Sequence, residues 1–195
     1  MLLEKSELTK EKILEQTISL IKENDGDTNR ITIRKIAERS EVGVGLINHY
    51  FESKEKLIEC CVQRIINGVI FSFKPDVCES LPRVDRIKLI AKLVMDFLMS
   101  NQQISRISIL GDMSNPKELD NTTRTVLGFA RSGISEKPSD ENIHEAFIFT
   151  SILQESFLRR DLLKKSMNVD FYEKKERDLY IDRIIDTVYG NGGLR

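Results

Sequence analysis

One pattern constrains the fold of this chain more than any other, because apolar residues recur three or four positions apart behind residues that cap helices. Thr32 precedes one such set and Ser53 another, and their hydroxyls can accept a hydrogen bond from the free amides of a first helical turn. No segment alternates apolar and polar residues as a half-buried strand does. With 31% charged and 7% aromatic residues, the composition also favours helices, and we expect an all-α protein.

Four helices are expected in the N-terminal third of the chain. The first is predicted to begin at Thr9, because Thr9 can cap it and Leu8 and Ile13 occupy the two positions of a hydrophobic staple. The polar run at residues 24–27 ends this helix. The next three helices are predicted over residues 33–39, over residues 44–50, and from Ser53 onward.

The rest of the chain predicts further helices. One follows Pro82, one contains residues 119–130, one follows a cap at Ser139 or Asp140, and the last contains residues 181–188. From Ala146 to Leu153 nearly every residue is apolar, and a helix that is apolar all round has to be covered on more than one side. We expect one side of it to face the core and another to face a second subunit.

Three short helices joined by tight turns, followed by a long one, are the arrangement of a helix-turn-helix head. Ile36 and Ala37 on the second helix and Ile47 on the third are predicted to face the core, with Val42 filling the turn between them. The rest of the third helix is then left for contact with DNA in the major groove.

Three segments closely resemble the head of the tetracycline-repressor (TetR) family, namely residues 32–37, 42–51 and 53–57. The most specific part is the run from His49 to Leu57, and the spacing from Thr32 to Lys54 matches that family without a gap. The resemblance covers roughly residues 9–60. It implies an N-terminal helix-turn-helix DNA-binding domain, here residues 1–53, and a C-terminal helical domain for effector binding and dimerisation, here residues 54–195.

Nine residues take the DNA-contacting positions of that family. The resemblance implies that the third helix reads the major groove through Val44, Gly45, Leu46, Asn48 and His49. It implies phosphate contacts for Thr32, Tyr50 and Lys54, and a phosphate or base contact for Arg34. Physical chemistry agrees, because a helix N-terminus attracts phosphate, an asparagine can pair with adenine, and apolar side chains can touch thymine methyl groups. Since the net charge is −1, the positive charge that meets DNA has to be local.

This sequence departs from the family at three positions. Glu41 stands where the turn usually has Gly, Gly43 stands where a Ser or Thr commonly caps the third helix, and Asn48 stands where an aromatic residue is common. Two other interpretations stay open: Arg34, Lys35 and Arg39 can form a solvated helix face, and Tyr50 and Phe51 can both belong to the core.

The resemblance implies a ligand-responsive transcriptional regulator, in this family usually a repressor, that binds a palindromic operator of double-stranded DNA as a homodimer. The last two helices, expected over residues 139–165 and 170–189, are predicted to form the dimer. Two recognition helices then lie about 34 Å apart, one turn of DNA, and a small-molecule effector releases the protein. In the alternative hypothesis the effector is a protein partner, and the content of a pocket in the helical domain separates the two.

Other function classes lack their residues in this sequence. With two His, three Cys, and no phosphate-binding glycine loop or metal-ligand spacing, we expect neither an enzyme nor a bound cofactor or metal. Cys60 and Cys61 are predicted to be buried or half-buried free thiols, with a redox switch as the alternative. The longest apolar stretch, Leu89–Met99, is interrupted by Lys92 and Asp96, so we expect a cytoplasmic protein that does not enter a membrane.

Overall fold

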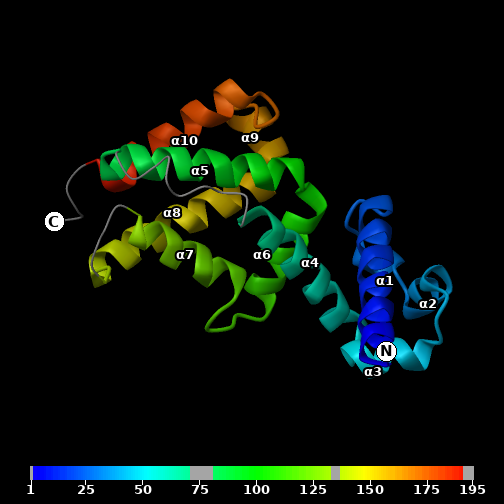
Figure 1. Ribbon diagram of the computed structural model, residues 1–195. Coiled ribbons are helices and arrows are strands. Elements are labelled where there is room, and N and C mark those ends of the chain that lie inside the picture. The colour runs from blue at the N-terminus through cyan, green and yellow to red at the C-terminus, as the bar shows by residue number, and fades with distance from the viewer. Residues whose placement is uncertain (1, 71–80, 133–136, 191–195) are drawn as a thin grey trace. The chain divides into compact units, whose positions relative to one another are not determined.

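The computed structural model describes residues 2–70, 81–132 and 137–190, and within these ranges every regular element is a helix (Figure 1). The elements are α1 (Leu2–Glu23), the 3-10 helix η1 (Thr28–Arg30), α2 (Ile33–Ser40), α3 (Val44–Phe51), α4 (Lys54–Ile70), α5 (Arg83–Ser100), α6 (Gln102–Ser114), α7 (Asn121–Arg131), α8 (Asp140–Leu158), α9 (Arg160–Met167) and α10 (Lys174–Tyr189). The expected all-α fold is confirmed. In the part of the chain that the structure describes, no helix has the length and apolar character needed to span a membrane.

The described residues form two compact units. The head unit comprises α1 to α4 and residues 102–108 of α6, and the body unit comprises α5, the rest of α6 and α7 to α10. The head unit therefore includes α4 and extends beyond residue 53. The functional boundary predicted between residues 53 and 54 stays a prediction.

The head unit closes around one apolar cluster. Its buried members are Ile13, Leu20, Ile21, Ile31, Ile36, Ala37, Ile47, Phe51, Leu57, Ile58, Cys61, Val62 and Ile104. The predicted core positions on the second and third helices are confirmed, since Ile36, Ala37 and Ile47 are all at most 5% exposed. Val42 is half-buried against the same cluster, as its predicted place in the turn requires.

The predicted start of the first helix is wrong. Helix α1 begins at Leu2, so Thr9 lies inside it, and Leu8 is 71% exposed and makes no hydrophobic staple with Ile13. The physical reason is propensity, because residues 2–8 consist mainly of Leu, Glu and Lys, which favour helix almost as well as Ala. A capping residue does not start a helix when good helix formers precede it.

The body unit has a larger core built partly from aromatic rings. Helix α7 packs along α8, and α10 packs against both α5 and α8. Phe129 and Phe149 meet edge to face with ring centroids 4.9 Å apart, and Tyr189 approaches Phe149 at 5.9 Å, which suits the charge distribution of aromatic rings. Ala146 and Leu153 are buried as well, so the predicted core-facing side of this apolar helix is confirmed.

A row of ion pairs joins α5 to α10, which lie side by side in Figure 1. The pairs are Lys88–Asp186, Lys92–Asp182, Asp96–Lys174 and Asp96–Arg177. Arg177 is only 6% exposed and also donates to the carbonyl of Phe171 at 2.6 Å. The charged run over residues 164–178 therefore contains a buried cation, Arg177.

The expected pair of C-terminal helices is corrected to three. Helix α8 ends at Leu158 because Arg159 leaves helical geometry (φ −103°, ψ 16°). The separate helix α9 ends at Met167 because the next residue, Asn168, is left-handed (φ 53°). Helix α10 starts at Lys174 and not at residue 170. Charged residues dominate this segment, so no apolar period marks the break. Helix α6 is also absent from the sequence prediction, since serines interrupt its apolar residues.

Candidate nucleic-acid interface

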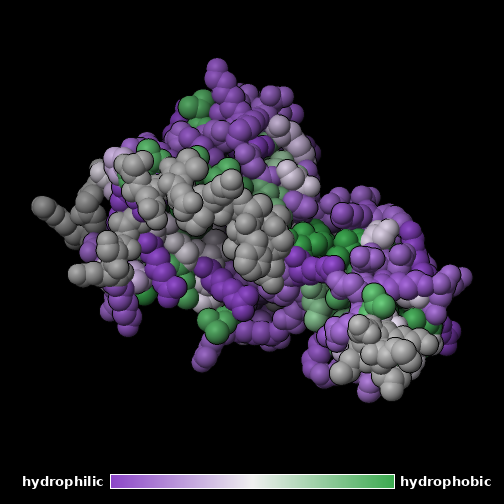
Figure 2. Space-filling view, in the orientation of Figure 1, coloured by the Kyte–Doolittle hydropathy of each residue, from purple (hydrophilic) through white to green (hydrophobic). Residues whose placement is uncertain are grey.

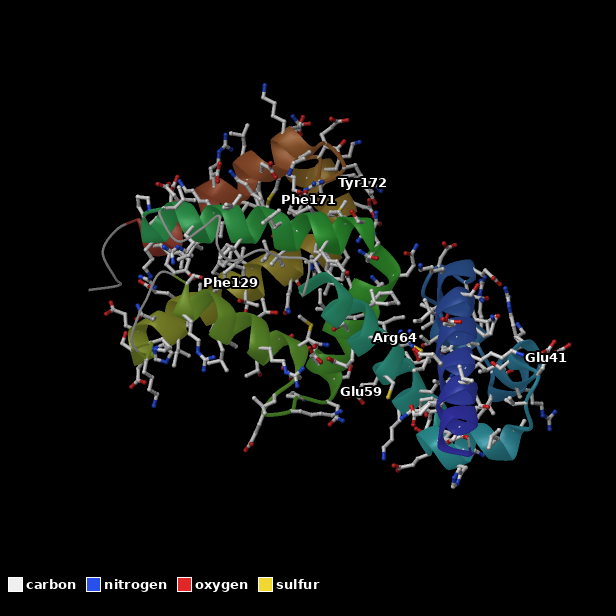
Figure 3. The ribbon with its side chains drawn as sticks, in the orientation of Figure 1. Glu41, Glu59, Arg64, Phe129, Phe171 and Tyr172 are labelled. Carbon is white, nitrogen blue, oxygen red and sulfur yellow. The ribbon has the colours of Figure 1, made fainter. Side chains whose placement is uncertain are left out.

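Helix α2 is positioned by caps at both ends. Thr32 accepts a hydrogen bond from the amide of Lys35 at 3.2 Å, so its predicted role as the helix cap is confirmed. At the other end Glu41 adopts left-handed geometry (φ 56°, ψ 43°), and its amide bonds to the carbonyls of Ala37 and Glu38. A side chain in this conformation is strained, which explains why Gly suits the position. Figure 3 shows Glu41 at the end of α2, where it pairs with Lys12 of α1.

Helix α3 has an anchored face and an open face. Ile47 is completely buried and Phe51 is 4% exposed, so these two side chains hold the helix on the head core. On the open face Asn48 and His49 are exposed, and Val44 is 39% exposed although it is apolar. The open face supplies the kind of surface that can enter a DNA groove.

The remaining two predicted reading positions differ from each other. Leu46 is half-buried, so it presents less of its side chain than its neighbours do. Gly45 is exposed, and a Cβ atom added there would meet no atom within 4 Å. Gly43 precedes the helix in extended geometry and provides no side-chain cap, which leaves amides of the first turn without a capping side chain.

The three cations of α2 have different environments. Arg39 pairs with Glu23 and bonds to Ser19, both on α1, so it fastens α2 to α1. Its guanidinium lowers the pKa of the Glu23 carboxyl through hydrogen bonding. Lys35 donates to the carbonyl of Arg30 at 3.2 Å. Arg34 is exposed and, among the described residues, has no ion pair or hydrogen bond, so it is the α2 cation open to a ligand.

Lys54 begins α4 beside the end of α3. Its ammonium donates to the carbonyl of Thr28 at 3.1 Å and is half-buried, while Ser53 caps the helix by accepting from the amide of Lys56 at 3.2 Å. An ammonium has three N–H donors, and the bond to Thr28 uses one of them. Lys54 can therefore hold η1, the element before α2, and still bind a phosphate.

Tyr50 is half-buried at the end of α3. Its ring contacts the ring of His49 (centroids 5.5 Å apart) and that of Phe51 (6.3 Å), and its hydroxyl oxygen lies 3.0 Å from Oγ of Ser6. Sequence reasoning gives no signal for Ser6, which lies 44 residues away in a segment predicted to precede the first helix.

The two cysteines of α4 differ in access. Cys61 is buried, its thiol lies 3.7 Å from the carbonyl oxygen of Leu14, and burial raises its pKa to about 12. Cys60 is exposed on the same helix, near Glu59 and Arg64, and Figure 3 shows Arg64 on the side of α4 that meets α1, where it pairs with Glu11. Both thiols are free, as predicted, but the predicted burial is confirmed only for Cys61 and is wrong for Cys60.

All nine predicted DNA-contacting residues lie in the head unit, on α2, α3, the start of α4 and the cap of α2. The described surface in view is mainly hydrophilic, with small apolar areas (Figure 2). The arrangement offers one exposed helix for a groove, with hydroxyl and cationic groups on the elements next to it. That is the chemistry of a protein that binds DNA through phosphate contacts beside a reading helix.

Comparison with known proteins agrees with this geometry. Residues 13–61 match the family described as bacterial regulatory proteins, tetR family. Over 97 residues the chain is 27% identical to proteins named nucleoid occlusion factor SlmA from Actinobacillus pleuropneumoniae serotype 5b (strain L20) and serotype 3 (strain JL03). These matches cover 50% of this chain and 48% of each of those proteins, so the chain spans about half the length of the curated relatives it matches.

A solved structure shows the same fold over nearly the whole chain. It is a TetR transcriptional regulator from Rhodococcus sp. RHA1, with a TM-score of 0.64 and 15% sequence identity, and the match covers 97% of this chain and 98% of that one. At 15% identity the structural match shows the fold alone, and the family match concerns residues 13–61 of the head. Residues 13–61 thus match the tetR family of bacterial regulatory proteins, and the chain shares its overall fold with a TetR transcriptional regulator.

Proposed function

We propose that the protein is a homodimeric repressor that binds an inverted-repeat operator through α3 and is released by a small-molecule effector. The observation that carries the proposal is the open face of α3, where Val44, Asn48 and His49 are exposed while Ile47 and Phe51 anchor the helix. An anchored helix with a free face is what the major groove requires, because the groove admits a helix whose side chains reach the base edges.

Each of the nine predicted residues receives a proposed role from its environment. Val44, Gly45, Leu46, Asn48 and His49 are proposed to face bases. Thr32, Tyr50 and Lys54 are proposed to bind phosphate, and Arg34 is proposed to bind phosphate or a base edge. The two cations support this division, since Lys54 is held beside α3 by Thr28 and Arg34 has a free guanidinium.

Dimerisation is proposed to use the C-terminal helices α8 and α10. Both carry exposed apolar side chains beside the core, with Phe147 at 57%, Ile148 at 38% and Leu179 at 50% exposure. Large apolar side chains at the surface of neighbouring helices are typical of a subunit interface. A twofold dimer presents two copies of α3 to the same face of DNA, which is why we expect an inverted repeat.

The effector is proposed to bind the body unit and to favour a dimer whose two heads do not fit the operator. A coupling of about 1–3 kcal/mol between effector and DNA lowers the affinity about 5- to 150-fold, which is enough for release. The protein is expected in the cytoplasm because its proposed ligand is chromosomal DNA, and we propose no catalytic step for it.

A second candidate function keeps the fold and the DNA contacts but replaces the small molecule with a protein partner. The observation that favours it is the similarity to proteins named nucleoid occlusion factors. The two candidate functions differ in the kind of molecule that releases the protein from DNA. A screen of small molecules against the protein–operator complex tests the first, and pull-down with operator-bound protein tests the second.

Selection of operator DNA from a random pool with the full chain is the first experiment. We expect enrichment of an inverted repeat with half-sites about one helical turn apart. Failure to enrich any inverted repeat would contradict the proposal. The dimer is tested by Leu179→Glu, which should give a monomer in sedimentation, whereas Leu119→Glu, at a position 63% exposed between α6 and α7, should leave the dimer intact.

Two variants then separate reading from phosphate contact. Asn48→Ala should change the enriched sequence, and an unchanged sequence would remove Asn48 from the reading residues. Lys54→Ala should weaken binding to every sequence and reduce the slope of log affinity against log salt by about one. Lys56→Ala is the matched control, because this lysine stands in the same helical turn but pairs with Glu52.

A further inference from the structure

The N-terminal turns of α1 reach the end of α3. Because α1 begins at Leu2, the segment over residues 2–8 is helical and carries Ser6 beside Tyr50. The two hydroxyl oxygens are 3.0 Å apart and part-buried, which is hydrogen-bond distance. Ser6 therefore makes a tertiary contact with the recognition helix from a part of the chain outside the helix-turn-helix.

This contact fixes the phenol of Tyr50. The ring lies between contacts to His49 and Phe51, and the hydroxyl is bonded to Ser6, so both ends of the side chain are held. A side chain that is already held in its bound position loses less entropy when a ligand arrives. A hydroxyl has one donor and two acceptor sites, so Tyr50 can accept from Ser6 and still donate its own proton to a phosphate oxygen. Donation by Ser6 also polarises the phenol and strengthens that second bond.

We propose that Ser6, in the N-terminal part of α1, is a positioning residue for the phosphate contact of Tyr50. The inference rests on the proposed function, since it assumes that Tyr50 meets a DNA phosphate. It adds a residue outside the helix-turn-helix whose hydroxyl sets the strength of that contact. It also makes position 6 sensitive to charge, because a carboxylate there would accept the hydrogen bond of the phenol in place of the phosphate and would repel the phosphate.

A double-mutant cycle tests the proposal with the full chain and the enriched operator duplex. Ser6→Ala should weaken binding about 2- to 10-fold, the usual range for the loss of one hydrogen bond. Tyr50→Phe should weaken it at least as much, and adding Ser6→Ala to Tyr50→Phe should cause no further loss. Ser6→Thr, which keeps the hydroxyl, should bind like the parent chain, and Ser6→Asp should bind more weakly than Ser6→Ala.

The matched control is Ser19→Ala, which removes a serine hydroxyl from the same helix that bonds to Glu23 and leaves Tyr50 untouched. It should not change operator affinity. Additive losses from Ser6→Ala and Tyr50→Phe, or unchanged affinity in Ser6→Ala, would overturn the proposal.

A measurement without DNA separates this inference from the proposed function. The chain has four tyrosines, so the fluorine resonance of Tyr50 in fluorotyrosine-labelled protein is assigned by its loss in Tyr50→Phe. That resonance should shift in Ser6→Ala and stay in place in Ser19→Ala. A shift with no operator binding in the parent chain would contradict the proposed function alone, whereas operator binding without a shift would contradict the role of Ser6.

Discussion

The head unit and the body unit both bury an apolar cluster, but their sequences are constrained to different degrees. Each closes around one apolar cluster, but the head places two helices of only eight residues, α2 and α3, beside the long helices α1 and α4, whereas α5 and α8 of the body have 18 and 19. Short helices depend on caps and turn geometry, so single residues such as Thr32 and Glu41 decide their ends. Long amphipathic helices depend mainly on buried volume, which many sequences can supply.

The difference explains why the head can be recognised in sequence and the body cannot. In the head, the cap, the left-handed turn and the anchoring residues stand at fixed spacing, because α3 has to present one face outward. In the body, Phe129, Phe149 and Tyr189 interlock, but other combinations of the same total volume would also fill that space. We therefore expect the largest changes in stability where a substitution removes buried volume in the body. We expect the smallest changes where a substitution alters backbone conformation in the head.

The largest effect is expected from Phe149→Ala in the body core. Phe149 is completely buried between Phe129 and Tyr189, so its truncation should lower the free energy of unfolding by about 3–5 kcal/mol in urea denaturation. Leu119→Ala, at a position 63% exposed and outside the proposed dimer interface, is the control. It should change monomer stability far less, and equal losses in the two variants would mean that buried volume does not govern the body.

The second effect concerns the ion pairs of Asp96. Burial raises the pKa of this carboxyl, but hydrogen bonds from Lys174 and Arg177 outweigh burial and bring the pKa below its ordinary value of 3.8. Because the folded pKa is lowered, the stabilisation is complete above the ordinary value and is lost as the pH falls through the folded pKa.

Asp96→Asn should therefore lower stability by about 1 kcal/mol at neutral pH, and its stability should fall less steeply on acidification than that of the parent chain. Chemical denaturation between pH 2 and about pH 7 measures both effects. Glu23→Gln in the head, where the carboxyl pairs with Arg39 in solvent, should show a smaller loss. A larger loss from Glu23→Gln would reverse the expected order of the two units.

The third effect compares two left-handed helix ends, Glu41 of the head (φ 56°) and Asn168 of the body (φ 53°). Glu41→Gly removes the clash of a side chain in this conformation and should raise Tm by about 2–4 °C, since the lost pair with Lys12 is exposed. Asn168→Gly should gain less, because Asn tolerates this conformation better than Glu does. Equal or opposite changes would show that strain at Glu41 is relieved elsewhere.

The smallest effect is expected from Gly45→Ala at the start of α3. The added methyl group meets no atom within 4 Å, and Ala favours helix over Gly by roughly 0.5–1 kcal/mol. Tm should rise slightly. The same methyl group lies on the open face, so operator selection with this variant should return an altered half-site, and an unaltered one would place Gly45 outside the groove.

The sequence predicts the head in detail because local signals and tertiary roles coincide there. Thr32 and Ser53 cap the helices they precede, and Ile36 and Ile47 are buried as their spacing requires. The start of α1 could not be predicted from Thr9, because a cap signal competes with the helix-forming residues before it. The bond of Ser6 to Tyr50 is a long-range contact, and no local pattern encodes it.

In the body, the sequence predicts helices but not their limits. The break at Arg159 lies between two stretches that both favour helix, so residue propensity does not mark it. Arg160 donates to the carbonyl of Phe157 and to the hydroxyl of Tyr172, which favours a bend at this point. Arg177 could not be predicted as buried, since a cation enters a core only when partners such as Asp96 and the Phe171 carbonyl meet it there.

The row of charges between α5 and α10 sets how these helices can move. Its sign changes at Asp96, so a slide of one turn in one direction would place Asp96 opposite Asp182, with like charges together. A slide in the other direction would separate Asp96 from Arg177, which is only 6% exposed and would lose its carboxylate partner. The two helices should therefore travel as one stiff element. Under the proposed function, we expect the effector to shift α7 and α8 against that element and not to change the register between α5 and α10.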